Sequence, residues 1–103
     1  MRVMIVIPIL KLKPESDGYK DMYNAIKDKI IERGDTPVEY INIYNWEDHL
    51  SDRGQLYRLY YSIKVMKDCD CVYFGKGWNT DIRCIDEYTI ASKYGLKIEY
   101  EGV

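Results

Sequence analysis

The sequence predicts an α/β domain with a parallel sheet. Short apolar segments alternate with helical patterns in the order βαβαβαβ, which requires parallel pairing and right-handed crossovers. The 103 residues suffice for a single core, and no repeat, low-complexity tract or linker interrupts them. We therefore expect residues 1–103 to form one small flavodoxin-like or Rossmann-like sandwich, with four strands in the order 2-1-3-4 and three helices. Its ligand pocket is expected between the ends of strands one and three.

The first half of the chain predicts two strands around one helix. Residues 3–9 are continuously apolar, which is typical of a central strand, and are too few for a signal peptide or a membrane span. Ser16 or Asp17 begins a helix with apolar residues at helical spacing, and Gly34 ends it. Residues 37–44 mix apolar and polar positions, which predicts a strand nearer the sheet edge.

The second helix is expected after a polar loop that contains Trp46, beginning at Ser51 or Asp52. Its apolar stripe consists of Leu56, Leu59, Tyr60, Ile63 and Met66. Three tyrosines lie around one turn of this helix: Tyr57, Tyr60 and Tyr61. Half-buried packing explains such tyrosines, and a homodimer interface is the sharper interpretation.

The last third of the chain predicts a strand, a glycine loop, a helix and a short final strand. Residues 71–74 form an apolar run of strand formers, which the glycines of residues 75–77 break. Thr80 or Asp81 begins the third helix, and Gly95 ends it. Residues 96–100 form the last strand.

Composition and charge argue against several classes of function. The net charge of −2 gives no basic footprint of the kind that nucleic-acid binding usually needs. Of the three cysteines, Cys69 and Cys71 form a Cys-x-Cys step in a predicted strand, which rarely closes a disulfide, so a reduced, cytoplasmic protein is expected. A zinc site needs four ligands, and the only histidine, His49, lies far away in the sequence. We expect neither a metal nor an organic cofactor.

Glu87 is the strongest candidate for chemistry. Its neighbours at helical spacing, Cys84 and Ala91, are small and apolar, which predicts partial burial and a perturbed pKa. It follows a strand whose end, in an open α/β sheet, is where ligands bind. Asp81 lies six residues earlier, and two interpretations stay open for it: a helix N-cap or a group that contacts a ligand.

A family resemblance rests on four features in this part of the chain: Cys69-Asp70, Gly77-Trp78, Glu87 and Ala91. They match a pattern that reads Cys-Asp, an apolar strand, then G-W-x-x-S-x-G-A-x-x-E-x-x-x-A. The chain thereby resembles the nucleoside 2-deoxyribosyltransferase-like family, especially a branch of short, often phage-encoded members of unassigned activity. The resemblance covers the order of elements along nearly the whole chain.

The resemblance implies an enzyme that cleaves or transfers N-glycosidic bonds of nucleosides or deoxynucleosides. Glu87 would be the nucleophile and Asp81 would contact the base, whereas related nucleotide hydrolases carry a phosphate-binding Ser at that position. Trp78 would stack on the base and Trp46 would close the pocket from the other side. The full set of expected substrate-binding residues is Pro8, Ile9, Trp46, Gly77, Trp78, Asn79, Thr80 and Arg83.

The chain departs from the family pattern at three places. Arg83 stands where Gly is favoured, residues 4–8 lack a Tyr and a Gly, and Ser62 stands near the position of an additional Asp. These departures favour an alternative: a catalytically silent, phage-type binding protein on the same fold. Such a protein would act against host defence, for example as an anti-CRISPR, by binding a host effector or a nucleotide in the host cytoplasm.

Overall fold

Four parallel strands form one sheet in the order β2-β1-β3-β4, so the predicted topology is confirmed. The structure is a computed structural model that describes residues 1–8, 16–38 and 52–101. Its elements in chain order are β1 (Arg2–Val6), α1 (Asp17–Glu32), β2 (Thr36–Val38), α2 (Asp52–Met66), β3 (Cys71–Phe74), the short 3-10 helix η3 (Trp78–Thr80), α3 (Ile82–Lys93) and β4 (Lys97–Tyr100).

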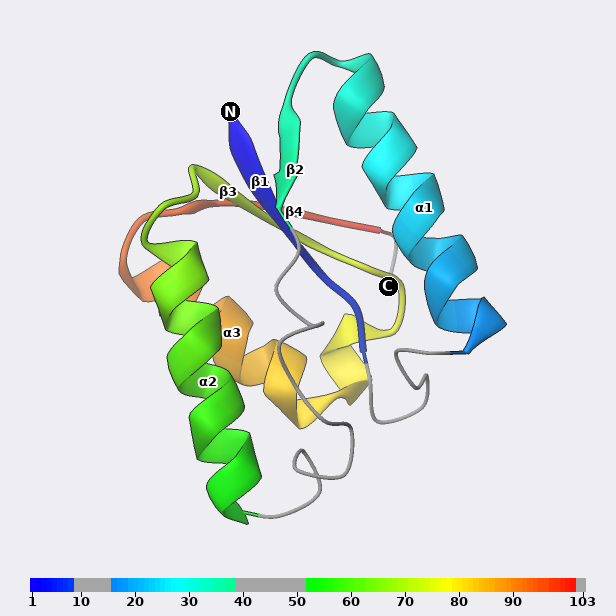
Figure 1. The fold of residues 1–103 in the computed structure, drawn as a ribbon. Helices are drawn as coiled ribbons and strands as arrows, with labels where there is room; N and C mark the ends of the chain where they lie inside the picture. Colours follow the sequence, from blue (N-terminus) through cyan, green and yellow to red (C-terminus); the bar gives the residue numbers. More distant parts are fainter. Residues whose placement is uncertain (9–15, 39–51, 102–103) are drawn as a thin grey trace.

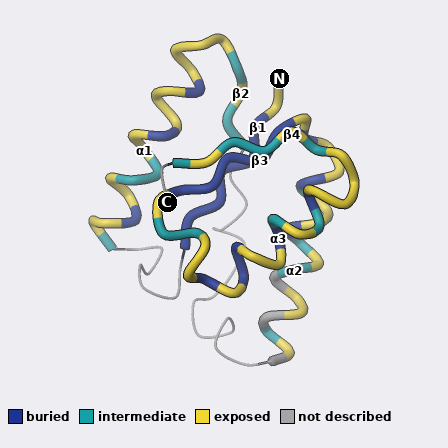
Figure 2. Tube along the Cα trace, turned by 180° about the vertical axis from the view of Figure 1, so that it is seen from behind, coloured by how far each residue is buried: buried dark blue, intermediate teal, exposed yellow. Residues whose placement is uncertain are grey.

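The sheet lies between two helical layers, with α1 on one face and α2 and α3 on the other (Figure 1). β1 and β3 are the central strands, and both are buried along their length, whereas β2 and β4 at the edges are only partly covered (Figure 2). The continuous apolar runs of the sequence therefore identified the central pair correctly. Of the second predicted strand, residues 37 and 38 pair with β1, and residues 39–44 lie outside the described part of the chain. The observed strand begins one residue earlier, at Thr36.

α1 begins and ends where the sequence predicts. The side chain of Ser16 accepts a hydrogen bond from the backbone N–H of Tyr19 at 3.2 Å, which is an N-cap. Gly34 follows the last turn with φ +86°, a left-handed conformation that glycine adopts without steric cost. Between these ends, Tyr19, Ile26 and Ile30 are buried against the sheet.

α2 presents a different face to the core than its apolar stripe predicts. Of the predicted stripe, Met66 is buried and Leu59 half-buried, whereas Leu56, Tyr60 and Ile63 are exposed. Ser62, outside the stripe, is buried. Apolar residues are spread around more than one side of this helix, so spacing alone does not identify the buried side. None of the helices among the described residues is long and apolar enough to cross a membrane.

Two ion pairs connect α1 to β4, the edge strand, and to the residue that follows it. Arg33 donates two hydrogen bonds of 2.7 Å to the carboxylate of Glu99. One turn earlier, Lys29 lies 3.0 Å from Glu101, which also accepts a hydrogen bond from Tyr73 at 2.8 Å. We refer to Lys29, Arg33, Glu99 and Glu101 as the charge ladder.

Glu99 of the charge ladder also contacts the Cys71 thiol. Burial is the main cause, and a hydrogen bond of 3.1 Å to Glu99 adds to it; together they raise the pKa of Cys71 to about 12. A thiol with so high a pKa is a packing group rather than a nucleophile.

Candidate functional site

The loops that follow β1 and β3 meet at the carboxyl edge of the sheet. Gly77 adopts φ +90°, and a Cβ atom built on it would lie 3.7 Å from Cγ of Pro8. Pro8 itself is buried. The predicted neighbourhood of strand ends one and three is therefore present, and the N-terminus of α3 begins beside it.

Asp81 caps α3. Its Oδ1 accepts hydrogen bonds from the backbone N–H groups of Arg83 at 2.9 Å and Cys84 at 3.4 Å, and the residue is 2% exposed. The N-cap interpretation, which the sequence left open, is what the structure contains. A contact between Asp81 and a base stays a prediction.

Glu87 is completely buried, with 0% exposure. Cys84 and Ala91, three residues before it and four residues after it, are buried as well and form one stripe of α3. The burial expected from these small neighbours is confirmed. A carboxylate removed from water costs free energy unless other groups compensate its charge, so its place in the core requires a reason.

Arg83 brings a buried cation to the same helix. It is 3% exposed and lies four residues before Glu87, which puts both on one face of α3. Three ionisable side chains, Asp81, Arg83 and Glu87, are thus nearly or fully inaccessible within seven residues. We refer to them as the buried charge cluster. Charged residues are seldom fully buried, and such clusters are enriched at functional sites.

Trp78 packs within an aromatic group instead of projecting from an open loop. Its ring stacks on Tyr88 with centroids 4.8 Å apart and contacts the rings of Phe74 and Tyr100 at 5.4 and 5.7 Å. Trp78 is half-buried, and η3 places its ring against Tyr88 of α3 and Tyr100 of β4. Its stacking on a base stays a prediction.

Ser62, which the sequence marked only as a departure from a family pattern, is completely buried in α2. Its Oγ has no hydrogen-bond partner within the described ranges.

The remaining predicted residues divide into two groups. Asn79 and Thr80 are exposed in η3, where the Thr80 hydroxyl donates a hydrogen bond to the Gly77 carbonyl at 2.8 Å. Ile9 and Trp46 lie outside the described residues. Within residues 1–8, 16–38 and 52–101, no group of three or more His, Cys, Asp or Glu side chains is arranged to hold a metal ion.

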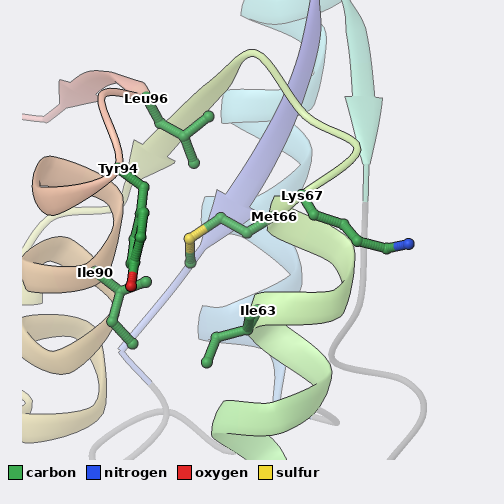
Figure 3. Close-up of a pocket in the computed structure, with 6 residues that line it drawn as sticks. All are labelled: Ile63, Met66, Lys67, Ile90, Tyr94 and Leu96. Atoms are coloured by element: carbon green, nitrogen blue, oxygen red, sulfur yellow. The ribbon is translucent and has the colours of Figure 1, made fainter.

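A pocket that the sequence did not predict lies at the other end of α2 and α3. It has a volume of about 360 Å³ and is lined by Ile63, Met66, Lys67, Ile90, Tyr94 and Leu96. Its walls come from the last turns of both helices and the start of β4 (Figure 3). Because these turns precede β3 and β4, the pocket opens at the amino edge of the sheet, away from the buried charge cluster.

Comparisons with protein-family models, with curated proteins and with solved structures find no match for this chain. The fold assignment therefore rests on the structure alone, and any function has to be argued from the residues.

Proposed function

We propose that this chain acts on the N-glycosidic bond of a nucleoside or deoxynucleoside, as a transferase or hydrolase with Glu87 as the nucleophile. The observation that carries the proposal is the complete burial of the Glu87 carboxylate on the helix that begins at the carboxyl edge of the two central strands. Ligands of open α/β sheets bind at this edge. The motif that links Gly77-Trp78 to Glu87 supports the same family of reactions.

The proposed reaction has two steps. One carboxylate oxygen of Glu87 forms a bond to the anomeric carbon of the sugar while the bond from that carbon to the base nitrogen breaks. The electron pair leaves with the base, which takes up a proton. The positive charge that develops on the sugar ring is stabilised by the carboxylate. A nitrogen of a second base, or water, then attacks the same carbon, loses a proton and releases Glu87.

Asp81 and Trp78 would recognise the base. Asp81 is an anion at the start of α3, so it would repel a 5′-phosphate, and a nucleoside is a better substrate than a nucleoside monophosphate. A serine at the same position would keep the cap and leave the backbone amides of the helix N-terminus open to a phosphate.

The test is release or exchange of free base from a panel of deoxynucleosides and ribonucleosides. Glu87→Ala and the isosteric Glu87→Gln should both abolish turnover, because the nucleophile contributes to the barrier far more than to packing. The matched control is Asp86→Asn, which neutralises the adjacent, exposed carboxylate of the same helix and should retain activity. Asp81→Ser should slow turnover less than the Glu87 variants and extend it to monophosphates.

A second candidate function is the silent binding protein, and Arg83 favours it. A buried guanidinium one turn before Glu87 lowers the nucleophilicity of a nearby carboxylate and occupies space in the core. Absence of turnover by the wild type on nucleosides and monophosphates, together with unchanged ligand binding by Glu87→Ala, would replace the enzyme by this alternative. A homodimer through the tyrosine-rich α2 remains compatible with both.

A further inference from the structure

We propose that the outer surface formed by α2 and α3 docks an amphipathic helix of a partner protein, one that carries an apolar ridge flanked by acidic side chains. The docking surface consists of the pocket at the ends of the two helices and of the exposed apolar residues of α2 that continue from it: Leu56, Tyr60 and Ile63. It is independent of the buried charge cluster and of the function proposed above.

The pocket has the shape of a receptor for apolar side chains. Ile63 and Met66 of α2 face Ile90 and Tyr94 of α3 across it, with Leu96 at one end (Figure 3). Its walls are open: Tyr94 is 73% exposed and Ile63 is 43% exposed. A small molecule in so open a hollow would remain largely in water, whereas a protein segment laid across it would cover both walls.

The apolar stripe on α2 indicates a helical partner. Leu56, Tyr60, Ile63 and Lys67 follow one another at spacings of four, three and four residues, so they share one side of the helix. Leu56 is 67% exposed. From Leu56 to Ile63 the apolar part spans eight residues, about 10.5 Å at the rise of an α-helix, which matches two turns of a partner laid alongside. Recognition of this kind uses anchors at i, i+3 or i+4, and i+7.

The charged residues beside the pocket indicate which side chains should flank the apolar ridge of the partner helix. Lys67 lines the pocket and extends away from its apolar interior (Figure 3). On the opposite wall, the ammonium group of Lys93 lies 5.7 Å from the centre of the Tyr94 ring. Lys97 follows Leu96 and is exposed. The chain as a whole carries a net charge of −2, yet Lys67 and Lys93 lie at the pocket, and their positive charge complements an acidic partner.

The same lysines argue against a second copy of this chain as the occupant, and therefore against a homodimer that uses Tyr60. A two-fold interface places the same patch of both subunits together. Both halves of such an interface would carry Lys67 and no acidic residue of the docking surface, so positive charge would be added without being neutralised.

The test uses two synthetic 14-residue helical peptides with the same leucine pattern, one with glutamate and one with lysine at every flanking position. Methyl NMR of the protein should show shifts at Ile63, Met66 and Ile90 with the glutamate peptide, at an affinity at least tenfold higher than with the lysine peptide. Added salt should narrow this difference. Ile63→Ser should weaken binding at least tenfold, whereas Ile31→Ser should not, because Ile31 is comparably exposed on α1. Lys67→Glu combined with Lys93→Glu should remove or reverse the preference.

Three outcomes would overturn the proposal. The first is no binding of the glutamate peptide, or equal affinity for both peptides. The second is binding that shifts signals outside the docking surface, or that Ile31→Ser weakens as much as Ile63→Ser. The third is a wild-type dimer in sedimentation experiments that Ile63→Ser dissociates, since the surface would then be occupied by a second copy.

Discussion

Gly75 is the residue at which the sheet and α1 approach most closely at the end of β3. A Cβ atom added there would lie 2.9 Å from Sδ of Met22, and 3.5 Å from side-chain atoms of Ile26 and Ile7. Real Cβ contacts are not this short, so a larger residue forces α1 or its side chains to move. The glycine that the sequence assigns to a turn also serves helix packing.

We expect Gly75→Ala to lower the free energy of unfolding by about 1–3 kcal/mol, the usual cost of overpacking a core. Urea denaturation in a double-mutant cycle with Met22→Ala locates the cause. Removing the Met22 thioether should make the glycine substitution less costly. An equal cost in both backgrounds would show that the contact with Met22 is not responsible.

Asp81 allows the cap to be separated from any role in a ligand site. Asp81→Ala should lower the free energy of unfolding by about 0.5–2 kcal/mol, because two amides at the start of α3 lose their acceptor. Asp81→Asn and Asp81→Ser retain a capping group and should cost less. Asp86→Ala, at an exposed position of the same helix, is the control. Equal losses for Ala and Asn would exclude capping as the main contribution.

At the scale of elements, the charge ladder makes the attachment of β4 to α1 dependent on pH. The guanidinium of Arg33 is the main cause that lowers the pKa of Glu99 in the folded protein. The folded state therefore binds the Glu99 proton less readily than the unfolded chain, whose Glu pKa is about 4.3. The contribution of Glu99 to stability is complete above that pH and is lost as the pH falls through the lowered folded pKa.

Glu99→Gln should accordingly lower the free energy of unfolding at pH 7 by about 0.5–1.5 kcal/mol, the net value of a typical hydrogen bond, because water screens the partly exposed Arg33–Glu99 pair. The difference from the wild type should stay constant between about pH 5 and 7 and shrink below about pH 4. Urea midpoints measured across this range check both statements. Glu32→Gln, at an exposed position of α1, serves as the control. A difference that does not change with pH would contradict the argument.

The helices show where sequence patterns suffice at this scale and where they do not. α1 was predictable because a cap, a periodic apolar stripe and a glycine all agree. α2 was not, because Tyr57, Tyr60, Leu56 and Ile63 supply apolar surface on sides that α3 and the sheet leave exposed. The buried side carries Ser62 together with Met66, and hydrophobicity does not single out a serine.

At the scale of the whole molecule, all three cysteines lie in the core. Cys71 and Cys84 are inaccessible and Cys69 is nearly so, with free thiols. Burial raises the pKa of Cys69, and at pH 8 only about one Cys71 thiol in ten thousand would be ionised, given its pKa of about 12.

We therefore expect a thiol reagent at pH 8 to label the three cysteines together, at the rate at which the protein opens. In urea, all three should react at once. Stabilising the protein should slow labelling in the same proportion for each thiol. Rapid labelling of one cysteine in native buffer, at the rate of an exposed thiol, would contradict a fully closed core.

The topology was predictable from the sequence because the order of elements leaves few alternatives once crossovers are right-handed. The burial of Glu87 was predictable from Cys84 and Ala91. The pocket was not, because it depends on how α2 and α3 pack together. The burial of Ser62 was not, because a serine gives no hydrophobic signal. Arg83 was noted as a long cation where glycine is favoured, and only the packed structure places it inside.

The charge ladder determines which strand can pair with β3 at this side of the sheet. Its basic residues are four apart on a helix, about 6.0 Å, and its acidic residues are two apart on an extended chain, about 6.6 Å. The two spacings are nearly equal, so only one alignment of β4 along α1 allows both ion pairs, Arg33–Glu99 and Lys29–Glu101, to form. A slip by one residue would turn Glu99 and Glu101 toward α3, where Ile98 and Tyr100 now pack. A foreign strand that took the place of β4 beside β3, without this spacing of acids, would leave Lys29 and Arg33 unneutralised. The charge ladder therefore favours β4 over any other strand at this position.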